Sequence, residues 1–151
     1  MKRWSLRLGC AALLLVTALP ARASGTTVEG ELSGVEVCPQ LACGAAIFTG
    51  NFHGKINNRP SLGYFWTAVQ HEPLPDPGAT VAITGGRWNI TTLFRSISGR
   101  VQSGTLHNNG DNSFNIDAVL EIDRGGSGSV TFSGLLDHTV FPPTIDGVLL
   151  P

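Results

Sequence analysis

The chain carries little positive charge once its N-terminal segment is set aside. The whole sequence has ten lysines and arginines against eleven aspartates and glutamates. Four of the basic residues fall in residues 1–23 and all the acidic residues come later, so six minus eleven leaves residues 24–151 with a formal charge of −5. A chain of this charge has no electrostatic attraction to nucleic acid or to an anionic membrane surface, and we expect neither as a partner.

Long apolar runs are also scarce. The one candidate, CAALLLVTAL, is too short for a spanning helix, follows a positively charged start and precedes the small-residue motif ARA that ends at Ala23. This layout predicts a secretory signal peptide over residues 1–23, and export to the periplasm or the extracellular space. A lipoprotein signal centred on Cys10 is the alternative, but Arg7 stands where such a signal has an apolar residue. No second apolar stretch predicts a membrane span in residues 24–151.

Cysteine is rare, and its spacing excludes most cysteine chemistry. Only Cys38 and Cys43 follow the predicted signal, in EVCPQLACG. In an exported protein such a pair is expected to form a disulfide, which here would staple a turn. A soft metal site and a redox pair are the alternatives. The spacing C-x4-C with an internal proline differs from the C-x-x-C of redox motifs.

Recognisable catalytic and cofactor motifs are missing as well. The chain has no G-x-S-x-G, and its GGSGS stretch lacks the lysine and the following helix of a phosphate-binding loop. The NNGDNS stretch at 108–113 has oxygen ligands but not the acidic spacing of an EF-hand. We therefore expect no cofactor and no dedicated metal site.

Helical periodicity is absent, and two-residue alternation takes its place. In SFNIDAVLEID five apolar side chains fall on one face, namely Phe114, Ile116, Ala118, Leu120 and Ile122, and FTGNFHGKI and ISGRVQSG repeat the pattern. RWNITTLF groups Trp88, Ile90, Thr92 and Phe94 on one face in the same way. Strands with one apolar and one wet face are typical of antiparallel sheets. Glycine- and proline-rich turns separate about eight or nine such strands.

Glycines on the apolar faces favour a closed sheet. Gly50 and Gly54 alternate with Phe48, Phe52 and Ile56, and small residues between large ones suit a strongly curved sheet. We therefore predict an all-β, single-domain antiparallel β-barrel over residues 24–151, with a coiled β-sandwich as the alternative. The glycine-spaced FTGNFHG and the run of short strands resemble the small barrels of allene oxide cyclases and dirigent proteins. That resemblance implies a fold and transfers no catalytic residue.

Two similar segments, FWTAVQHEPLP and FSGLLDHTVFPP, each contain a histidine shortly before a proline. Alternation turns His71 and His138 inward at the ends of their strands, just before prolines. The two imidazoles could pin proline-rich crossings, bind a ligand, ligate a metal, or act as acid and base at a barrel mouth. Tyr64 and Trp66 lie on the face opposite Phe65, where an aromatic patch could meet a ligand or another subunit.

The sequence supports three functions. The leading one is a non-catalytic binding or interaction module, with a small-molecule ligand or a protein partner held near His71, His138, Tyr64 and Trp66. The second is a cyclase, isomerase or hydrolase in which His71 and His138 are catalytic. The third is a structural component of the cell envelope. Large aromatic residues could fill so small a barrel, so whether the interior is open, like the oligomeric state, is left undecided.

Overall fold

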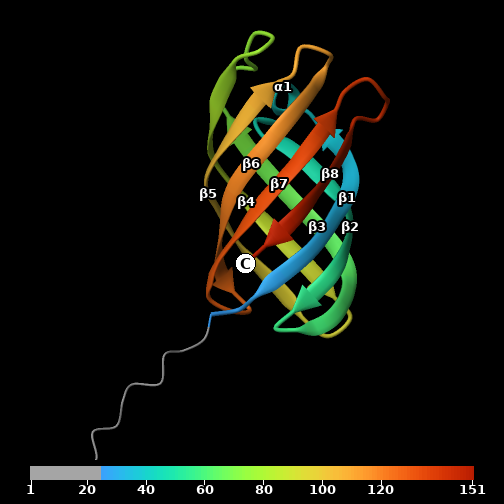
Figure 1. Ribbon diagram of the computed structural model, residues 1–151, viewed down its shortest axis with the longest axis vertical. Helices are drawn as coiled ribbons and strands as arrows, with labels where there is room; N and C mark the ends of the chain where they lie inside the picture. The colour runs from blue at the N-terminus through green and yellow to red at the C-terminus, as the bar shows by residue number, and fades with distance from the viewer. Residues whose placement is uncertain (1–24) are drawn as a thin grey trace, which may run out of the picture.

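Eight strands of alternating pattern close on themselves to form one antiparallel barrel (Figure 1). The strands are β1 (Val28–Cys38), β2 (Ala46–Ile56), β3 (Arg59–His71), β4 (Thr80–Thr92), β5 (Ser96–Asn108), β6 (Ser113–Arg124), β7 (Gly128–Asp137) and β8 (Thr144–Leu150). Each strand pairs with the next in sequence, and β8 pairs with β1 to close the ring. The predicted antiparallel barrel is therefore confirmed, and the sandwich is excluded.

This computed structural model describes residues 25–151, so the predicted signal peptide lies outside the described residues. Between β1 and β2 the chain forms one short helix, α1 (Gln40–Cys43), which the alternation did not predict. No helix within residues 25–151 has the length and apolar character needed to cross a membrane.

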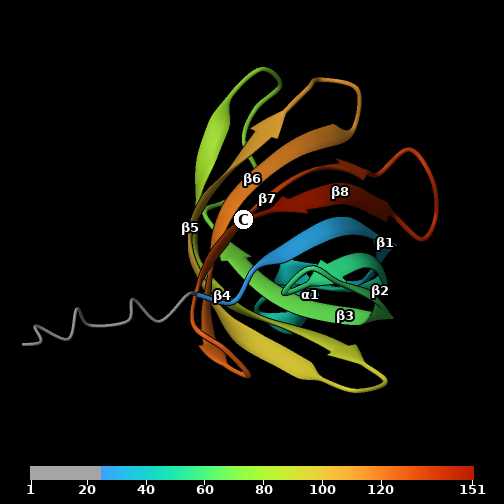
Figure 2. The same cartoon turned by 60° about the horizontal axis from the view of Figure 1, so that its bottom comes forward.

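The loops lie at the two ends of the barrel, which we call the mouth end and the base end. The mouth end comprises residues 39–45, 72–79, 109–112 and 138–143. The base end comprises residues 25–27, 57–58, 93–95 and 125–127. In Figure 1 the mouth end, with α1, lies at the top and the base end at the bottom. Figure 2 shows α1 within the ring of strands.

The inward face of the barrel is apolar, as the alternation predicted. Phe48, Phe52 and Ile56 of β2 are buried, and so are the five apolar residues on the inward face of β6, namely Phe114, Ile116, Ala118, Leu120 and Ile122. Burial of these side chains is the main favourable contribution to folding.

Phe94 is the exception, because its side chain is 93% exposed. The strand β4 ends at Thr92, whose backbone N–H and hydroxyl both donate to the carbonyl of Arg95, at 2.7 and 3.0 Å. These bonds close a tight hairpin, so the alternation stops two residues before Phe94. The prediction that Phe94 joins Trp88 and Ile90 inside the barrel is wrong.

Glycine pairs give two aromatic rings room against the barrel wall. Gly34 pairs with Gly50 between β1 and β2, and the ring of Phe65 lies over them. A Cβ atom added at Gly50 would come within 2.8 Å of the Phe65 ring, and one at Gly34 within 2.9 Å. The same arrangement recurs between β7 and β8, where Gly134 and Gly147 face Phe132. Glycine is needed here for space, which supports the predicted role of small residues in a curved sheet.

The base end is closed by hydrogen bonds and by side chains. The N–H of Thr26 donates to Ser127 O at 2.7 Å, and the N–H of Thr27 donates to the side chain of Asn57 at 3.0 Å. Above them the fully buried side chains of Val28, Phe52 and Val130 pack together. These contacts close the base end of the barrel.

Candidate ligand-binding cavity

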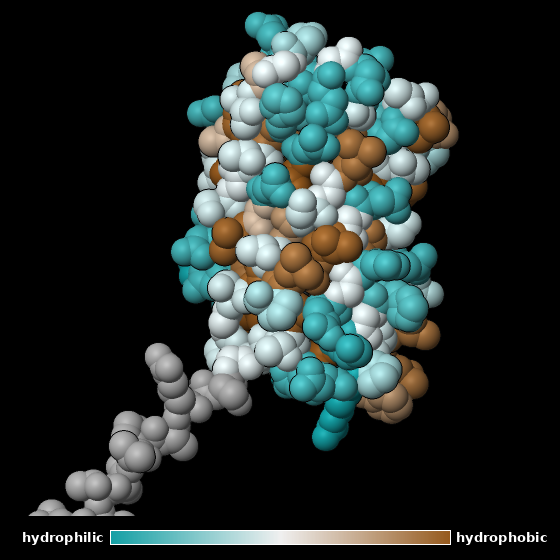
Figure 3. Space-filling model, viewed as in Figure 1, coloured by the Kyte–Doolittle hydropathy of each residue, from teal (hydrophilic) through white to brown (hydrophobic). Residues whose placement is uncertain are grey.

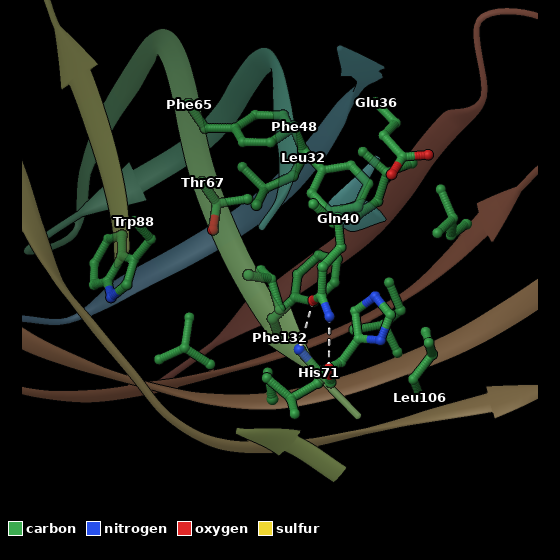
Figure 4. A pocket seen from close by; sticks show the side chains of 18 of the residues that line it. Leu32, Glu36, Gln40, Phe48, Phe65, Thr67, His71, Trp88, Leu106 and Phe132 are labelled. Atoms are coloured by element: carbon green, nitrogen blue, oxygen red, sulfur yellow. Dashed lines mark hydrogen bonds between the residues drawn. The ribbon is translucent and has the colours of Figure 1, made fainter. Parts of the chain in front are cut away.

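A cavity of about 310 Å³ lies inside the barrel and reaches from α1 at the mouth to Ile90 and Leu149 in the base half. All eight strands contribute to its wall, and nearly every wall residue is apolar. Figure 4 shows the rings of Phe48, Phe65, Trp88 and Phe132 converging on this space. Small residues keep it open, because Ala46 and Ala118 stand at wall positions where larger side chains would project inward.

Trp88 forms part of the cavity wall, and its indole nitrogen already has a hydrogen-bond partner in the barrel. Its indole Nε1 donates to the carbonyl oxygen of Glu121 at 3.1 Å, and the side chain is buried. The ring therefore presents apolar surface to the cavity, and its fluorescence would report on what the cavity contains.

The helix α1 partly covers the mouth, and two links hold it there. The predicted disulfide between Cys38 and Cys43 is present and ties α1 to the end of β1. The side chain of Gln40 then reaches across to β3, where it donates to His71 O at 2.7 Å and accepts from the N–H of His71 at 2.8 Å (Figure 4). Pro39 and Gln40 thereby become part of the cavity wall.

His71 lies at the mouth, where β3 is irregular in its pairing with β4. Its Nδ1 is hydrogen-bonded to the carbonyl oxygen of Glu72. A carbonyl only accepts, so Nδ1 carries the proton and the lone pair of a neutral ring is on Nε2. The side chain thus pins the start of the proline-rich loop 72–79, and it also contributes to the cavity wall.

His138 faces the same cavity but has a different partner. Its Nε2 lies 3.1 Å from Oε2 of Glu36, whose side chain is only 6% exposed. The contact lacks the angles of a hydrogen bond, and among residues 25–151 this buried Nε2 has no hydrogen-bond partner. The imidazole and the carboxylate are therefore close enough to interact, but each retains unused hydrogen-bonding capacity.

Three segments hold this pair in place. The backbone N–H of Glu36 donates to Pro143 O at 2.9 Å, which joins β1 to the loop before β8. The N–H of His138 donates to Asn112 O at 2.9 Å, and its ring packs edge-on against Phe114 with centroids 5.4 Å apart. The position of the pair thus depends on the mouth end as a whole.

The mouth end is acidic. Glu36, Glu72, Asp76, Asp111 and Asp137 lie in its loops or at the adjoining strand ends, and no lysine or arginine of residues 25–151 does. On the face drawn in Figure 3, this upper end is mainly hydrophilic. Hydrogen bonds from Ser113 lower the pKa of Asp111, and hydrogen bonds from Thr139 lower the pKa of Asp137. These hydrogen bonds favour the charged form of both aspartates.

The residues proposed from sequence do not form one group. His71 and His138 line one cavity, but the structure gives them separate partners, and their acid–base role stays a prediction. Tyr64 is 71% exposed on the outer wall, in a shallow depression shared with His53 and Leu62. Trp66 is 43% exposed on the same outer face, although its position on β3 also borders the cavity.

Sequence reasoning missed Glu36 and Gln40. A signal existed for Glu36, because it continues the inward alternation of Val28 and Leu32 on β1 and is the one charged residue on that face. For Gln40, which lies between the two cysteines, the sequence offered no signal.

The described part of the chain has no obvious metal site. Within residues 25–151 no three His, Cys, Asp or Glu side chains lie together so as to hold an ion. Comparison with protein family models, curated proteins and solved structures found no match. Any functional proposal for this chain therefore depends on its own geometry.

Proposed function

We propose that this protein is an exported, non-catalytic binding protein that holds a small apolar molecule inside its barrel. The observation that carries the proposal is the cavity of about 310 Å³ with its apolar wall. Apolar cavities with a few polar groups at one end are the usual form of small-molecule sites. Here the polar wall residues at the mouth are Glu36, Gln40, His71 and His138, and Thr67 and Asn89 lie deeper.

The volume limits the size of the ligand. An apolar cavity of about 150 Å³ accommodates benzene. A cavity of about 310 Å³ suits a molecule about twice that size, such as one aromatic ring with a short chain.

Export is supported by two features. Residues 1–23 have the layout of a secretory signal, and a disulfide such as Cys38–Cys43 persists in oxidising compartments. Mass spectrometry of the protein recovered outside the cytoplasm should find a chain that begins at Ser24 and lacks free thiols. Recovery of the full chain from the cytoplasm would contradict export without affecting the proposed ligand.

Trp88 provides the direct test of ligand binding. Replacing Trp4 and Trp66 by phenylalanine leaves Trp88 as the only tryptophan of the chain. Titration of this protein with the neutral probe phenylbutanol should change the fluorescence of Trp88 in a saturable way, because the probe would lie against the indole.

A pair of alanine variants makes the test specific to the cavity. Ala118→Leu would fill part of the cavity and should weaken phenylbutanol binding about tenfold or more, without loss of folding stability. The matched control is Ala82→Leu, since Ala82 is exposed on β4 and should leave binding unchanged. Equal binding by the Ala118→Leu variant and the parent, or no binding at all, would overturn the proposal.

A further inference from the structure

We propose that the ligand of this cavity is an apolar amine whose ammonium group donates to both Glu36 and His138 from inside the cavity. This inference rests on the proposed function, since it names the chemical class of the molecule in the same cavity. The buried Glu36 carboxylate, the unsatisfied Nε2 of His138 and the charge of the mouth end support it.

Glu36 is the first observation. Glu36 lines a cavity whose wall is mostly apolar, and its side chain is 6% exposed. Buried carboxylates are costly unless a charge or several hydrogen bonds compensate them. Among the described residues no side-chain or backbone group donates a hydrogen bond to the Glu36 carboxylate in good geometry. Its one close partner is His138 Nε2, which compensates the charge only when the imidazole is protonated.

His138 is the second observation. Its Nε2 is buried, lies 3.1 Å from Glu36 Oε2 and lacks a hydrogen-bond partner among residues 25–151. When His138 is neutral and its lone pair is on Nε2, this atom and the Glu36 oxygens are all acceptors. A primary ammonium group has three donors and one positive charge, so one such group could satisfy both side chains together.

The distribution of charge is the third observation. Five carboxylates and three histidines (His71, His107 and His138) lie at the mouth end, whereas the lysines and arginines of residues 25–151 lie elsewhere. Arg87 and Arg100 lie on the outer wall, where they pair with Asp123 and Glu121. The remaining four, Lys55, Arg59, Arg95 and Arg124, belong to the base end or the strand ends next to it. A negative entrance with apolar walls attracts cations and repels anions.

These features should discriminate between ligands that share one apolar body and differ in their polar group. A carboxylate ligand would place its charge against Glu36, which is unfavourable in an apolar cavity. An alcohol can donate one hydrogen bond and carries no charge, so it would leave most of the acceptors unsatisfied. An amine on the same apolar body should therefore bind most tightly.

The test compares three probes with the same phenylbutyl body, namely phenylbutylamine, phenylbutanol and phenylbutyric acid. Calorimetric titration of the unmodified protein at neutral pH and physiological salt should show the amine binding about tenfold tighter than the alcohol, as expected for a charge-assisted hydrogen bond. The acid should bind more weakly than the alcohol. This comparison needs no variant, so it does not depend on how a substitution folds.

Variants then locate the contact. Glu36→Gln keeps the shape of the side chain and removes its charge, so amine affinity should fall about tenfold while alcohol affinity stays within about threefold. The control is Asp76→Asn, which removes an exposed carboxylate of the same end and should change amine affinity by less than about threefold, because exposed charges interact weakly at this salt concentration.

The outcomes separate the two proposals. If the alcohol or the acid binds the unmodified protein as tightly as the amine, the ligand is not selected as an amine, although the apolar cavity still binds small molecules. If Asp76→Asn weakens amine binding as much as Glu36→Gln does, the selection is not made by Glu36. If none of the three probes binds, the proposed function itself is wrong.

Discussion

The side chain of Gln40 pairs with the backbone of His71 in the way a neighbouring strand would. Its amide donates to His71 O at 2.7 Å and accepts from the N–H of His71 at 2.8 Å. The helix α1 has no buried residue of its own, so its place in the mouth depends on this pair of bonds and on the disulfide. The cover of the cavity is thus held by polar and covalent links, while the barrel wall is held by apolar packing.

Gln40→Ala should loosen α1 and leave the barrel folded. Loss of the two partly buried hydrogen bonds should lower the stability by about 1–3 kcal/mol at most, and the amide of His71 should exchange with solvent about tenfold faster or more. Amide hydrogen exchange followed by NMR measures this directly. Gln102→Ala, an exposed position on β5, is the control, and equal exchange rates for His71 in both variants would contradict the interpretation.

Removal of the disulfide should have a modest effect on stability. The cysteines are five residues apart, and closing so short a loop contributes about 2 kcal/mol in the chain-entropy model. The double variant Cys38→Ser, Cys43→Ser should therefore fold as a barrel with a lower free energy of unfolding in urea. Loss of the far-UV circular dichroism of the barrel in this variant would show that the disulfide is needed for folding itself.

Gly50→Ala should destabilise the barrel, because its new Cβ would meet the Gly34 backbone and the Phe65 ring. Overpacking of this kind costs about 1–3 kcal/mol, and more where backbone must move. Gly85→Ala is the matched control on β4, since the nearest atom to its Cβ would be Gln70 Oε1 at 3.9 Å. Denaturant unfolding of both variants checks the prediction, and a similar loss of stability in the two would refute the steric explanation.

The stability conferred by Asp137 should disappear at acidic pH. Its Oδ1 accepts from the N–H of Thr139 at 2.7 Å and from the Thr139 hydroxyl at 2.6 Å, which lowers the pKa of Asp137 in the folded state. A depressed pKa means that the stabilisation is complete above the unfolded value, about 3.9, and is lost as the pH falls through the lower folded value.

Thermal unfolding from pH 7 down to pH 2 tests this expectation with Asp137→Asn. The unmodified protein should be the more stable at pH 7, and the difference between the two melting temperatures should shrink below about pH 4. Asp117→Asn, on the outer face of β6, serves as the control because no hydrogen bond among the described residues holds its side chain. A difference that stays constant over the whole range would show that charge on Asp137 is not the cause.

Local patterns were enough to predict the wall of the barrel. Which side of a strand a residue occupies depends only on its distance along the chain from its neighbours, so Phe48, Phe52 and the apolar residues of β6 were assigned correctly. The same rule failed at Phe94, because alternation holds only while the strand continues, and the bonds of Thr92 with Arg95 end it. The Cys38–Cys43 disulfide was predictable because its partners are close in sequence.

The contents of the barrel were decided by the tertiary structure. Whether a cavity forms depends on the difference between the enclosed volume and the summed side-chain volumes of eight strands, and that difference depends on register. The sequence could not show that Phe52 is packed at the base end while Ala46 and Ala118 leave room for a cavity. Likewise, Glu36 and His138 are about a hundred residues apart, and closure of β8 onto β1 brings them together. The sequence by itself determined a disulfide-linked antiparallel barrel, and long-range closure decided where its polar groups meet an apolar space.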